Sequence, residues 1–220
     1  MPTLHYHPGN ASLIAHIVLE EIGAPFALEF VDRAQSMHKS KAYLAMNPNG
    51  LIPVFIDDAP RHGDSPLVLY ETAAICMHLA DLHPAAALLP APATPERAQA
   101  YKWIAWLSNT LQPLLTMYFY PERWADDDAG AAAIRAKAEA KIAPMLDQLD
   151  AEFARHGQAW LLGERYGVAD AYAFVLCRWT RGFARPARSL AHLRPWLERV
   201  LARPAVQRAF ATEKLAAPFV

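Results

Sequence analysis

The stretch Thr3–Asp32, TLHYHPGNASLIAHIVLEEIGAPFALEFVD, places a segment of helical periodicity between two short apolar segments. The flanking segments TLHYH and FALEFVD have the length and composition of strands. Between them the apolar side chains recur at the spacing of one helix face, and Gly23 follows as a helix stop. Two strands that one helix joins in this way are parallel, with a right-handed crossover. The stretch therefore predicts a β-α-β unit.

The residues after this unit continue the alternation of helices and strands. They predict a short helix, two strands joined by a turn around residues 57–65, and another helix. In chain order these segments are KAYLAM (41–46), VFID (54–57), LVLY (67–70) and ETAAICMHLADLH (71–83). The predicted order is thus β-α-β-α-β-β-α, which makes residues 1–83 a small α/β domain.

A proline-rich connector follows at residues 84–95, where four prolines in a dozen residues favour a stiff, extended chain. Beyond it the apolar pattern is purely helical, so that residues 96–220 predict an all-α domain. The helices are expected at residues 96–120, 129–156, 168–183, 190–202 and 204–213.

Charge and cysteine usage limit the possible partners. The 21 basic and 22 acidic side chains leave a net charge of −1, so no overall field attracts nucleic acid or an anionic membrane. No segment has about 18 consecutive apolar residues, and the N-terminus lacks the pattern of a secretion signal. Cys76 and Cys177 lie in apolar helical patterns, which is typical of buried thiols in a reducing compartment. We therefore expect a cytoplasmic protein with small-molecule or protein partners.

The segment NPNGLIPVF (Asn47–Phe55) is the first motif that points to a ligand. A proline directly before a strand, after a glycine turn and a β-branched residue, predicts a cis Ile52–Pro53 bond. That geometry turns the backbone groups of Ile52 outward, where an extended peptide can pair with them as an added strand. The alternative is a proline that only terminates a turn.

The segment YETAAI (Tyr70–Ile75) is the second motif, because Glu71 and Thr72 stand where a strand ends and a helix begins. Free N–H groups and the positive end of the helix dipole favour a carboxylate there, and the Thr72 hydroxyl adds a donor. This predicts an anion site. An ordinary helix cap at Thr72, with Glu71 as a nearby acid, is the alternative.

A third motif, GVADAYAF (Gly167–Phe174), predicts a capping box in which the Asp170 carboxylate accepts the Gly167 N–H. We assign this motif to folding. In order and spacing, the three motifs resemble the cytosolic glutathione transferase family, and most closely its bacterial beta-like members. The resemblance covers essentially the whole chain and implies a thioredoxin-like N-terminal domain, an all-helical C-terminal domain and a homodimer.

The resemblance also implies a glutathione site. In it Ile52 pairs through its backbone with the cysteinyl part, Pro53 is cis, and Glu71 with Thr72 holds the γ-glutamyl end. One of the side chains before the second helix contacts the glycyl carboxylate, and the candidates are Gln35, His38 and Lys39. Beta-like members carry a histidine that touches glutathione on a helix of the second domain, and Gln112 stands at that position here.

The catalytic cysteine of beta-like members is replaced by Ala11, and the serine of other classes is replaced by Asn10. The remaining donors near this turn are the Asn10 amide, the Ser12 hydroxyl and the Tyr6 phenol. Lowering a thiol pKa from about 8.5 to about 6.5 takes roughly 2.7 kcal/mol. One donor to an anion supplies about 1.5 to 3 kcal/mol, so each of the three could suffice. Their alternatives are a helix cap for Ser12, a turn residue for Asn10 and a core residue for Tyr6.

His5 and His7 share a strand face, but no third ligand stands at a recognisable spacing, so no metal site is expected. Three polar residues interrupt the apolar run of helix 96–120: Asn109, Gln112 and Thr116. They either bond to another helix, are exposed to solvent, or face the ligand cleft beside the sulfur. In the same helix Pro113 is expected to produce a kink.

We expect an enzyme that conjugates the glutathione thiolate to small apolar electrophiles, in a detoxification role. Aromatic side chains at the end of helix 96–120 would suit an apolar pocket for the electrophile: Tyr118, Phe119, Tyr120 and Trp124. Two alternatives stay open. One is glutathione-dependent disulfide reduction, in which a second glutathione supplies the second thiol. The other is a binding protein that has the fold without turnover.

Overall fold

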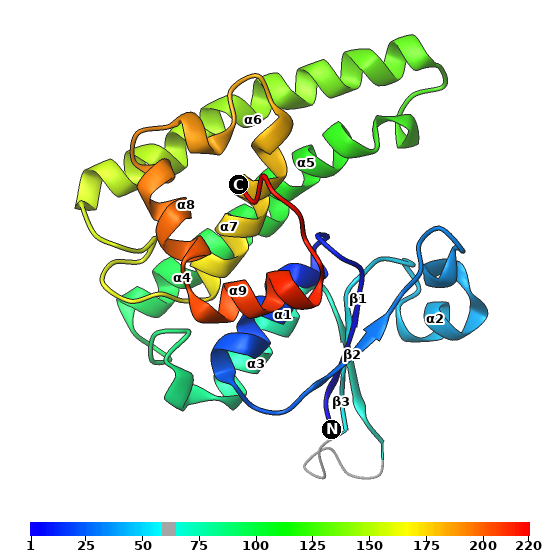
Figure 1. The fold of residues 1–220 in the computed structure, drawn as a ribbon, viewed down its shortest axis with the longest axis vertical. Coiled ribbons are helices and arrows are strands. Elements are labelled where there is room, and N and C mark those ends of the chain that lie inside the picture. Colours follow the sequence, from blue (N-terminus) through cyan, green and yellow to red (C-terminus); the bar gives the residue numbers. More distant parts are fainter. Residues whose placement is uncertain (59–64) are drawn as a thin grey trace. The chain divides into compact units, whose positions relative to one another are not determined.

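The structure is a computed structural model that describes residues 1–58 and 65–220, so most of the expected turn at 57–65 lies outside the described residues. The described chain forms two compact units (Figure 1). The first contains residues 1–89 and 202–216, and the second contains residues 90–201 and 217–220. The sequence pattern placed all of residues 96–220 in the helical domain, whereas the structure joins 202–216 to the first unit.

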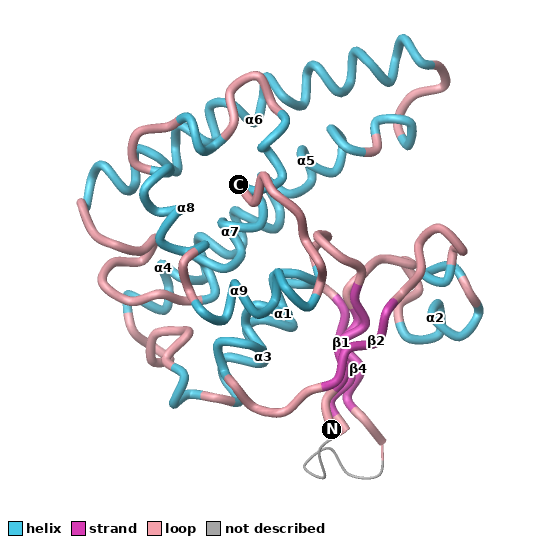
Figure 2. The backbone as a smooth tube through the Cα atoms, in the orientation of Figure 1, coloured by secondary structure: helices cyan, strands magenta, loops and turns pink. Residues whose placement is uncertain are grey.

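The first unit is built on a mixed sheet in which the strand order is β2-β1-β3-β4. As predicted, β1 and β2 are parallel, whereas β3 pairs antiparallel with both β1 and β4. Helices α1 and α3 lie on one side of the sheet and α2 on the other (Figure 2). The bounds are β1 Thr3–Tyr6, α1 Ser12–Ile22, β2 Ala27–Phe30, α2 Lys41–Met46, β3 Val54–Asp57, β4 Leu67–Tyr70, α3 Thr72–Leu82 and α9 Pro204–Thr212.

The core of this unit follows the predicted apolar pattern. Leu4 and Val54 of the sheet are fully buried, as are the apolar side chains of α1 at Leu13, Ile14 and Ile17. Helix α1 ends at Gly23, whose φ of 73° allows its N–H to bond to the Leu19 carbonyl at 3.0 Å, as expected for a glycine stop. Helix α9 packs on α1 because its apolar face, which includes Val206 and Phe210, is buried there.

The second unit is helical. Its helices are α4 Pro95–Trp106, α5 Gln112–Phe119, α6 Asp128–His156, α7 Val168–Trp179 and α8 Leu193–Leu201. The predicted helix 96–120 is interrupted by a π-helical turn at Leu107–Leu111. Pro113 lacks an N–H to bond to the carbonyl four residues earlier, which accounts for the widened turn. None of the described helices combines the length and apolar character needed to cross a membrane.

Helix α7 begins with the predicted capping box. The fully buried Asp170 carboxylate accepts the Gly167 N–H at 3.1 Å, which confirms the prediction. It also accepts the Leu161 N–H at 2.8 Å and the Trp196 Nε1–H at 3.0 Å. One carboxylate therefore joins the loop before α7, the start of α7 and helix α8.

Candidate functional site

Strand pairing brings the first two motifs and the β1–α1 turn to one end of the sheet. His5 of β1 lies opposite Val54 of β3, and Val54 lies opposite Tyr70 of β4. The segments that continue from these positions are the β1–α1 turn, the Ile52–Pro53 peptide and the start of α3. Residues that are distant in sequence are therefore neighbours at this end of the sheet.

The Ile52–Pro53 peptide bond is cis, as the sequence predicted. The preceding carbonyl, that of Leu51, accepts the Tyr43 hydroxyl at 2.9 Å and the Asn47 amide at 2.8 Å. Burial raises the pKa of the Tyr43 phenol, so this donor stays protonated. Among residues 1–58 and 65–220, the N–H and C=O of Ile52 have no hydrogen-bond partner. An extended ligand can therefore pair with them.

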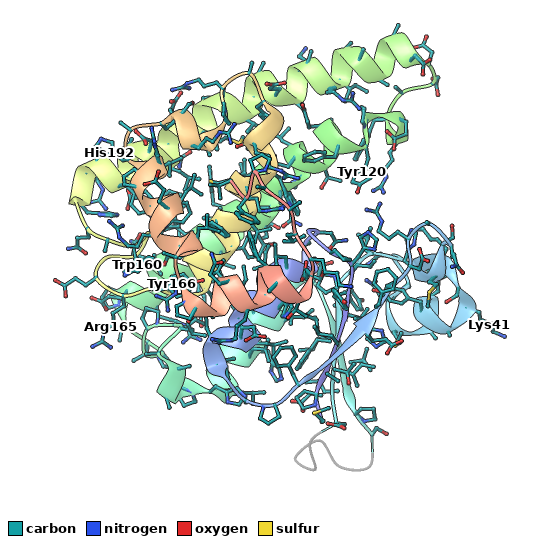
Figure 3. The ribbon with its side chains drawn as sticks, in the orientation of Figure 1. Lys41, Tyr120, Trp160, Arg165, Tyr166 and His192 are labelled. Carbon is teal, nitrogen blue, oxygen red and sulfur yellow. The ribbon has the colours of Figure 1, made fainter. Side chains whose placement is uncertain are left out.

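Lys39 lies against the turn that leads to Ile52. A Cβ atom on Gly50 would lie 2.8 Å from Lys39 Nζ and 3.0 Å from the His38 carbonyl oxygen, so only glycine leaves room for them. Lys41, the next lysine along the chain, is exposed and points away from the sheet (Figure 3). Lys39 is thus the lysine that could face a ligand on Ile52.

Replacing Gly50 with alanine is expected to destabilise the protein more than the same change at Gly23. Both glycines have a positive φ, 59° and 73°, which costs an alanine about 1 to 2 kcal/mol. A Cβ at Gly23 meets nothing within 4 Å, whereas at Gly50 it lies 3.0 Å from the backbone carbonyl oxygen of His38, which cannot swing away as the Lys39 side chain can. Overpacking adds about 1 kcal/mol or more at Gly50. Urea unfolding of both variants measures the difference, and equal losses would contradict the close approach of the His38 backbone to Gly50.

Glu71 and Thr72 lie at the junction of β4 and α3. Glu71 is exposed and has a φ of 71°, a conformation that costs a residue with a side chain about 1 to 3 kcal/mol. Thr72 begins the helix and does not cap it: Glu71 holds the cap position, and its side chain makes no cap hydrogen bond. The first N–H groups of α3 can donate to a bound anion, and the Glu71 carboxylate beside them can accept hydrogen bonds from a cation.

The β1–α1 turn contains two of the three predicted sulfur donors. Ser12 is 0% exposed, and its hydroxyl accepts the His7 N–H and donates to the His7 carbonyl, both at 3.1 Å. The Asn10 side-chain oxygen accepts the Ser12 N–H at 2.9 Å. The NH₂ group of Asn10 has no hydrogen-bond partner in the part of the chain that is described, so it is free to donate to a ligand.

Tyr6, the third predicted donor, ends β1 and is half-buried. Its ring packs edge-on against Phe30, with 6.0 Å between the ring centroids, and also lies near His16. Burial and the negative charge of Glu213 raise the pKa of the Tyr6 phenol. The phenol therefore stays protonated and keeps its ability to donate.

The polar residues of helix 96–120 lie in the second unit and do not share one role. Gln112 accepts the hydroxyl of Tyr172 on α7, so one of the predicted interhelical hydrogen bonds is confirmed. The Thr116 hydroxyl donates to the Gln112 carbonyl at 3.0 Å within the same helix, and Asn109 is exposed. The contact of Gln112 with glutathione stays a prediction.

Neither cysteine is available as a nucleophile. Burial raises the pKa of the Cys177 thiol to about 12 and that of the Cys76 thiol further. In the described residues, no group of three histidine, cysteine, aspartate or glutamate side chains could hold a metal ion. His7 instead places Nδ1 3.0 Å from the Val31 carbonyl oxygen.

Sequence reasoning missed Tyr43, Asn47 and Glu213. Tyr43 and Asn47 stand four residues apart at the end of α2, and this spacing could have indicated a shared target. Glu213 had no local signal, because its partners Gly9 and His16 lie some two hundred residues earlier.

Comparison with known proteins gives matches along most of the chain. Residues 11–82 match the family model of the glutathione S-transferase N-terminal domain, and residues 107–204 match that of the C-terminal domain. Glutathione S-transferase GstA of Escherichia coli O157:H7 is 31% identical over 96% of this chain and 98% of its own. Disulfide-bond oxidoreductase YfcG of Escherichia coli K12 is 28% identical over 98% of this chain and 97% of its own.

A solved structure agrees with these matches. The glutathione transferase homologue from Sulfitobacter, crystallised with bound glutathione, superposes with a TM-score of 0.85 at 27% identity, covering 98% of this chain and 99% of its own. Family models, sequence relatives and fold lead to one assignment: the chain belongs to the glutathione S-transferase family.

Proposed function

We propose that this protein is a glutathione transferase in which glutathione lies along the Ile52 backbone and its sulfur attacks a small apolar electrophile. The observation that carries the proposal is the Ile52 N–H and C=O, which have no hydrogen-bond partner among the described residues and lie at the end of the sheet, beside the start of α3. A peptide with an acidic head fits both features, because it can add as a strand and place its carboxylate at the helix end.

Each end of the tripeptide has a partner in this arrangement. The Glu71 carboxylate accepts the α-amino group of the γ-glutamyl residue, and Thr72 with the first N–H groups of α3 donates to its α-carboxylate. The Ile52 backbone pairs with the cysteinyl residue. Lys39, which lies over Gly50, neutralises the glycyl carboxylate. The GstA relative and the Sulfitobacter homologue support glutathione as the co-substrate.

The remaining task is to hold the sulfur as a thiolate. Asn10 is the principal donor in this proposal because its NH₂ group is free, whereas the Ser12 hydroxyl already donates to His7. Tyr6 and the N-terminus of α1 add to the effect. The thiol proton leaves to solvent. The thiolate electron pair then forms the new S–C bond while the leaving group departs with the electrons of its own bond.

Disulfide reduction is the second candidate. It would have to proceed without a protein thiol at the turn. With Ala11 at the cysteine position and Cys76 buried, the protein cannot form a mixed disulfide there. A second glutathione would have to resolve the first, as glutathione reduces a substrate disulfide to two thiols and becomes glutathione disulfide. The relative named disulfide-bond oxidoreductase supports this candidate. A homodimer, a cytoplasmic location and a detoxification role are parts of the transferase proposal.

Substitutions at Thr72, Asn10 and Ser12 separate the effects on glutathione binding from the effects on turnover. Thr72→Ala should weaken glutathione binding by about tenfold, with Thr72→Ser restoring it, because a donor to a carboxylate is lost and regained. Asn10→Ala should lower kcat by about 10- to 100-fold at saturating glutathione, whereas Ser12→Ala should lower it less. Calorimetry gives the affinity, and turnover is measured with a chlorodinitrobenzene and with hydroxyethyl disulfide.

The two electrophiles distinguish the candidates. Conjugation of the chlorodinitrobenzene supports the transferase, and turnover of the disulfide alone supports the reductase. Glutathione binding at millimolar concentration without either reaction supports a binding protein. If the intact protein binds no glutathione at that concentration, the proposed site is wrong.

A further inference from the structure

Glu213 is a fully buried carboxylate just beyond the end of α9. One of its oxygens, Oε1, lies 2.8 Å from His16 Nδ1 on α1. The other, Oε2, accepts the Gly9 N–H at 2.7 Å. Gly9 has a φ of 70° and lies in the β1–α1 turn, directly before Asn10. A single side chain of the C-terminal segment thus reaches the backbone of the turn that presents the proposed sulfur donor.

The surroundings of Glu213 show why its carboxylate stays in one place. His16 is itself fully buried, and its Nε2 lies 3.8 Å from Glu20 Oε1, so its ring has acidic groups on both sides. The ring is also packed against Tyr6 and Phe26. A buried carboxylate is costly unless each oxygen has a partner, and here both have one.

Other ion pairs hold α9 on α1 without touching the turn. Arg208 Nε lies 2.6 Å from Glu20 Oε2, and Arg203 Nη2 lies 2.8 Å from Glu21 Oε2 (Figure 1 shows the red α9 beside the blue α1). Docking of α9 therefore does not depend on Glu213 alone. What Glu213 adds is the bond to Gly9.

We propose that Glu213 is a positioning residue that fixes the β1–α1 turn, and so places the Asn10 amide for the glutathione sulfur. The role rests on the function proposed above. A charge-assisted hydrogen bond to a backbone N–H is short and directional, so it holds a left-handed glycine in one geometry. Without it, the turn loses the bond that ties it to the C-terminal segment and keeps local bonds such as those of Ser12 and Asn10. Burial and the charge of the same carboxylate both raise the pKa of Tyr6, which keeps that phenol protonated.

Amide hydrogen exchange in the protein without ligand tests the positioning independently of any activity. In Glu213→Met, which keeps the volume and removes both acceptors, the Gly9 amide should exchange about 100-fold faster than in the unmodified protein. Glu213→Gln should retain most of the protection, because its amide oxygen can still accept the Gly9 N–H. Arg208→Ala, which removes an α9–α1 pair that does not reach the turn, should leave Gly9 unchanged.

Two outcomes of the exchange experiment overturn the proposal. One is equal exchange at Gly9 in Glu213→Met and the unmodified protein. The other is the same acceleration in Arg208→Ala, since that would reflect loosening of α9 alone. If Glu213→Met does not fold, hydrogen exchange in the unmodified protein still tests the proposal. A Gly9 amide that exchanges there at the rate of an unprotected amide contradicts the bond to Glu213.

The catalytic consequence is measured on bound glutathione. In Glu213→Met, the pKa of the glutathione thiol, measured from the ultraviolet absorbance of the thiolate, should rise. The kcat should fall about 10- to 100-fold, while the glutathione Kd changes little. Glu213→Gln should recover most of kcat. Loss of Gly9 protection with an unchanged thiol pKa would overturn the link to catalysis. If the unmodified protein binds no glutathione, the proposed function fails, whereas the exchange result on the turn stands.

Discussion

Replacing Asp170 with alanine is expected to lower the free energy of unfolding by about 3 to 5 kcal/mol, the loss that follows when buried charged hydrogen bonds are broken. The Asp170 carboxylate accepts from Gly167, Leu161 and Trp196, and no water can replace it without opening the core around α7. The substitution leaves those three donors buried without an acceptor. Chemical denaturation followed by circular dichroism measures the change.

Asp127 provides the matched control, because it too is an aspartate at the start of a helix. Its carboxylate accepts the Gly130 N–H at 2.6 Å and caps α6, but this hydrogen bond is exposed. Water can replace it, so Asp127→Ala is expected to cost only about 1 kcal/mol. Similar losses in the two variants would show that Asp170 acts as a simple cap and does not join α7 to α8.

The elements of the first unit could be predicted because their signals are local. The predicted segments 41–46, 54–57 and 67–70 match α2, β3 and β4, since each is an apolar run bounded by turn residues. Gly23 ends α1 for the same reason: one glycine in a left-handed conformation is sufficient to stop a helix. The cis Ile52–Pro53 bond was also readable, from the turn and strand on either side of it.

The rest of the fold depended on long-range packing. Helix α9 was predicted as a helix, but its apolar pattern does not say which unit buries it, and α1 does so. The site shows the same limit. From the sequence, the Ser12 hydroxyl could donate to a ligand or to the backbone of the turn. Only the position of the His7 carbonyl in the folded chain shows that it donates to the backbone. Asn10 retains its free NH₂ group because its oxygen bonds to the backbone of Ser12.

Replacing Glu71 with alanine is expected to raise the glutathione Kd about 10- to 100-fold, because a hydrogen bond between two charged groups contributes about 1.5 to 3 kcal/mol. In the proposed site the Glu71 carboxylate is the partner of the glutathione α-amino group. Alanine keeps a Cβ atom and so keeps the strained backbone. Titration calorimetry with glutathione measures the loss. A γ-glutamyl peptide whose α-amino group is acetylated should bind with nearly the same Kd to Glu71→Ala and to the unmodified protein.

Glycine at the same position separates the backbone from the carboxylate. Because Glu71 has a φ of 71°, Glu71→Gly should relieve strain and stabilise the protein by about 1 kcal/mol while it loses the same affinity as Glu71→Ala. Stability and binding would then change in opposite directions at one residue, which is expected where strain is retained for function. If Glu71→Gly were less stable than the unmodified protein, the backbone at this position would not be strained. If Glu71→Ala bound glutathione as tightly as the unmodified protein, the carboxylate would not be the amine partner.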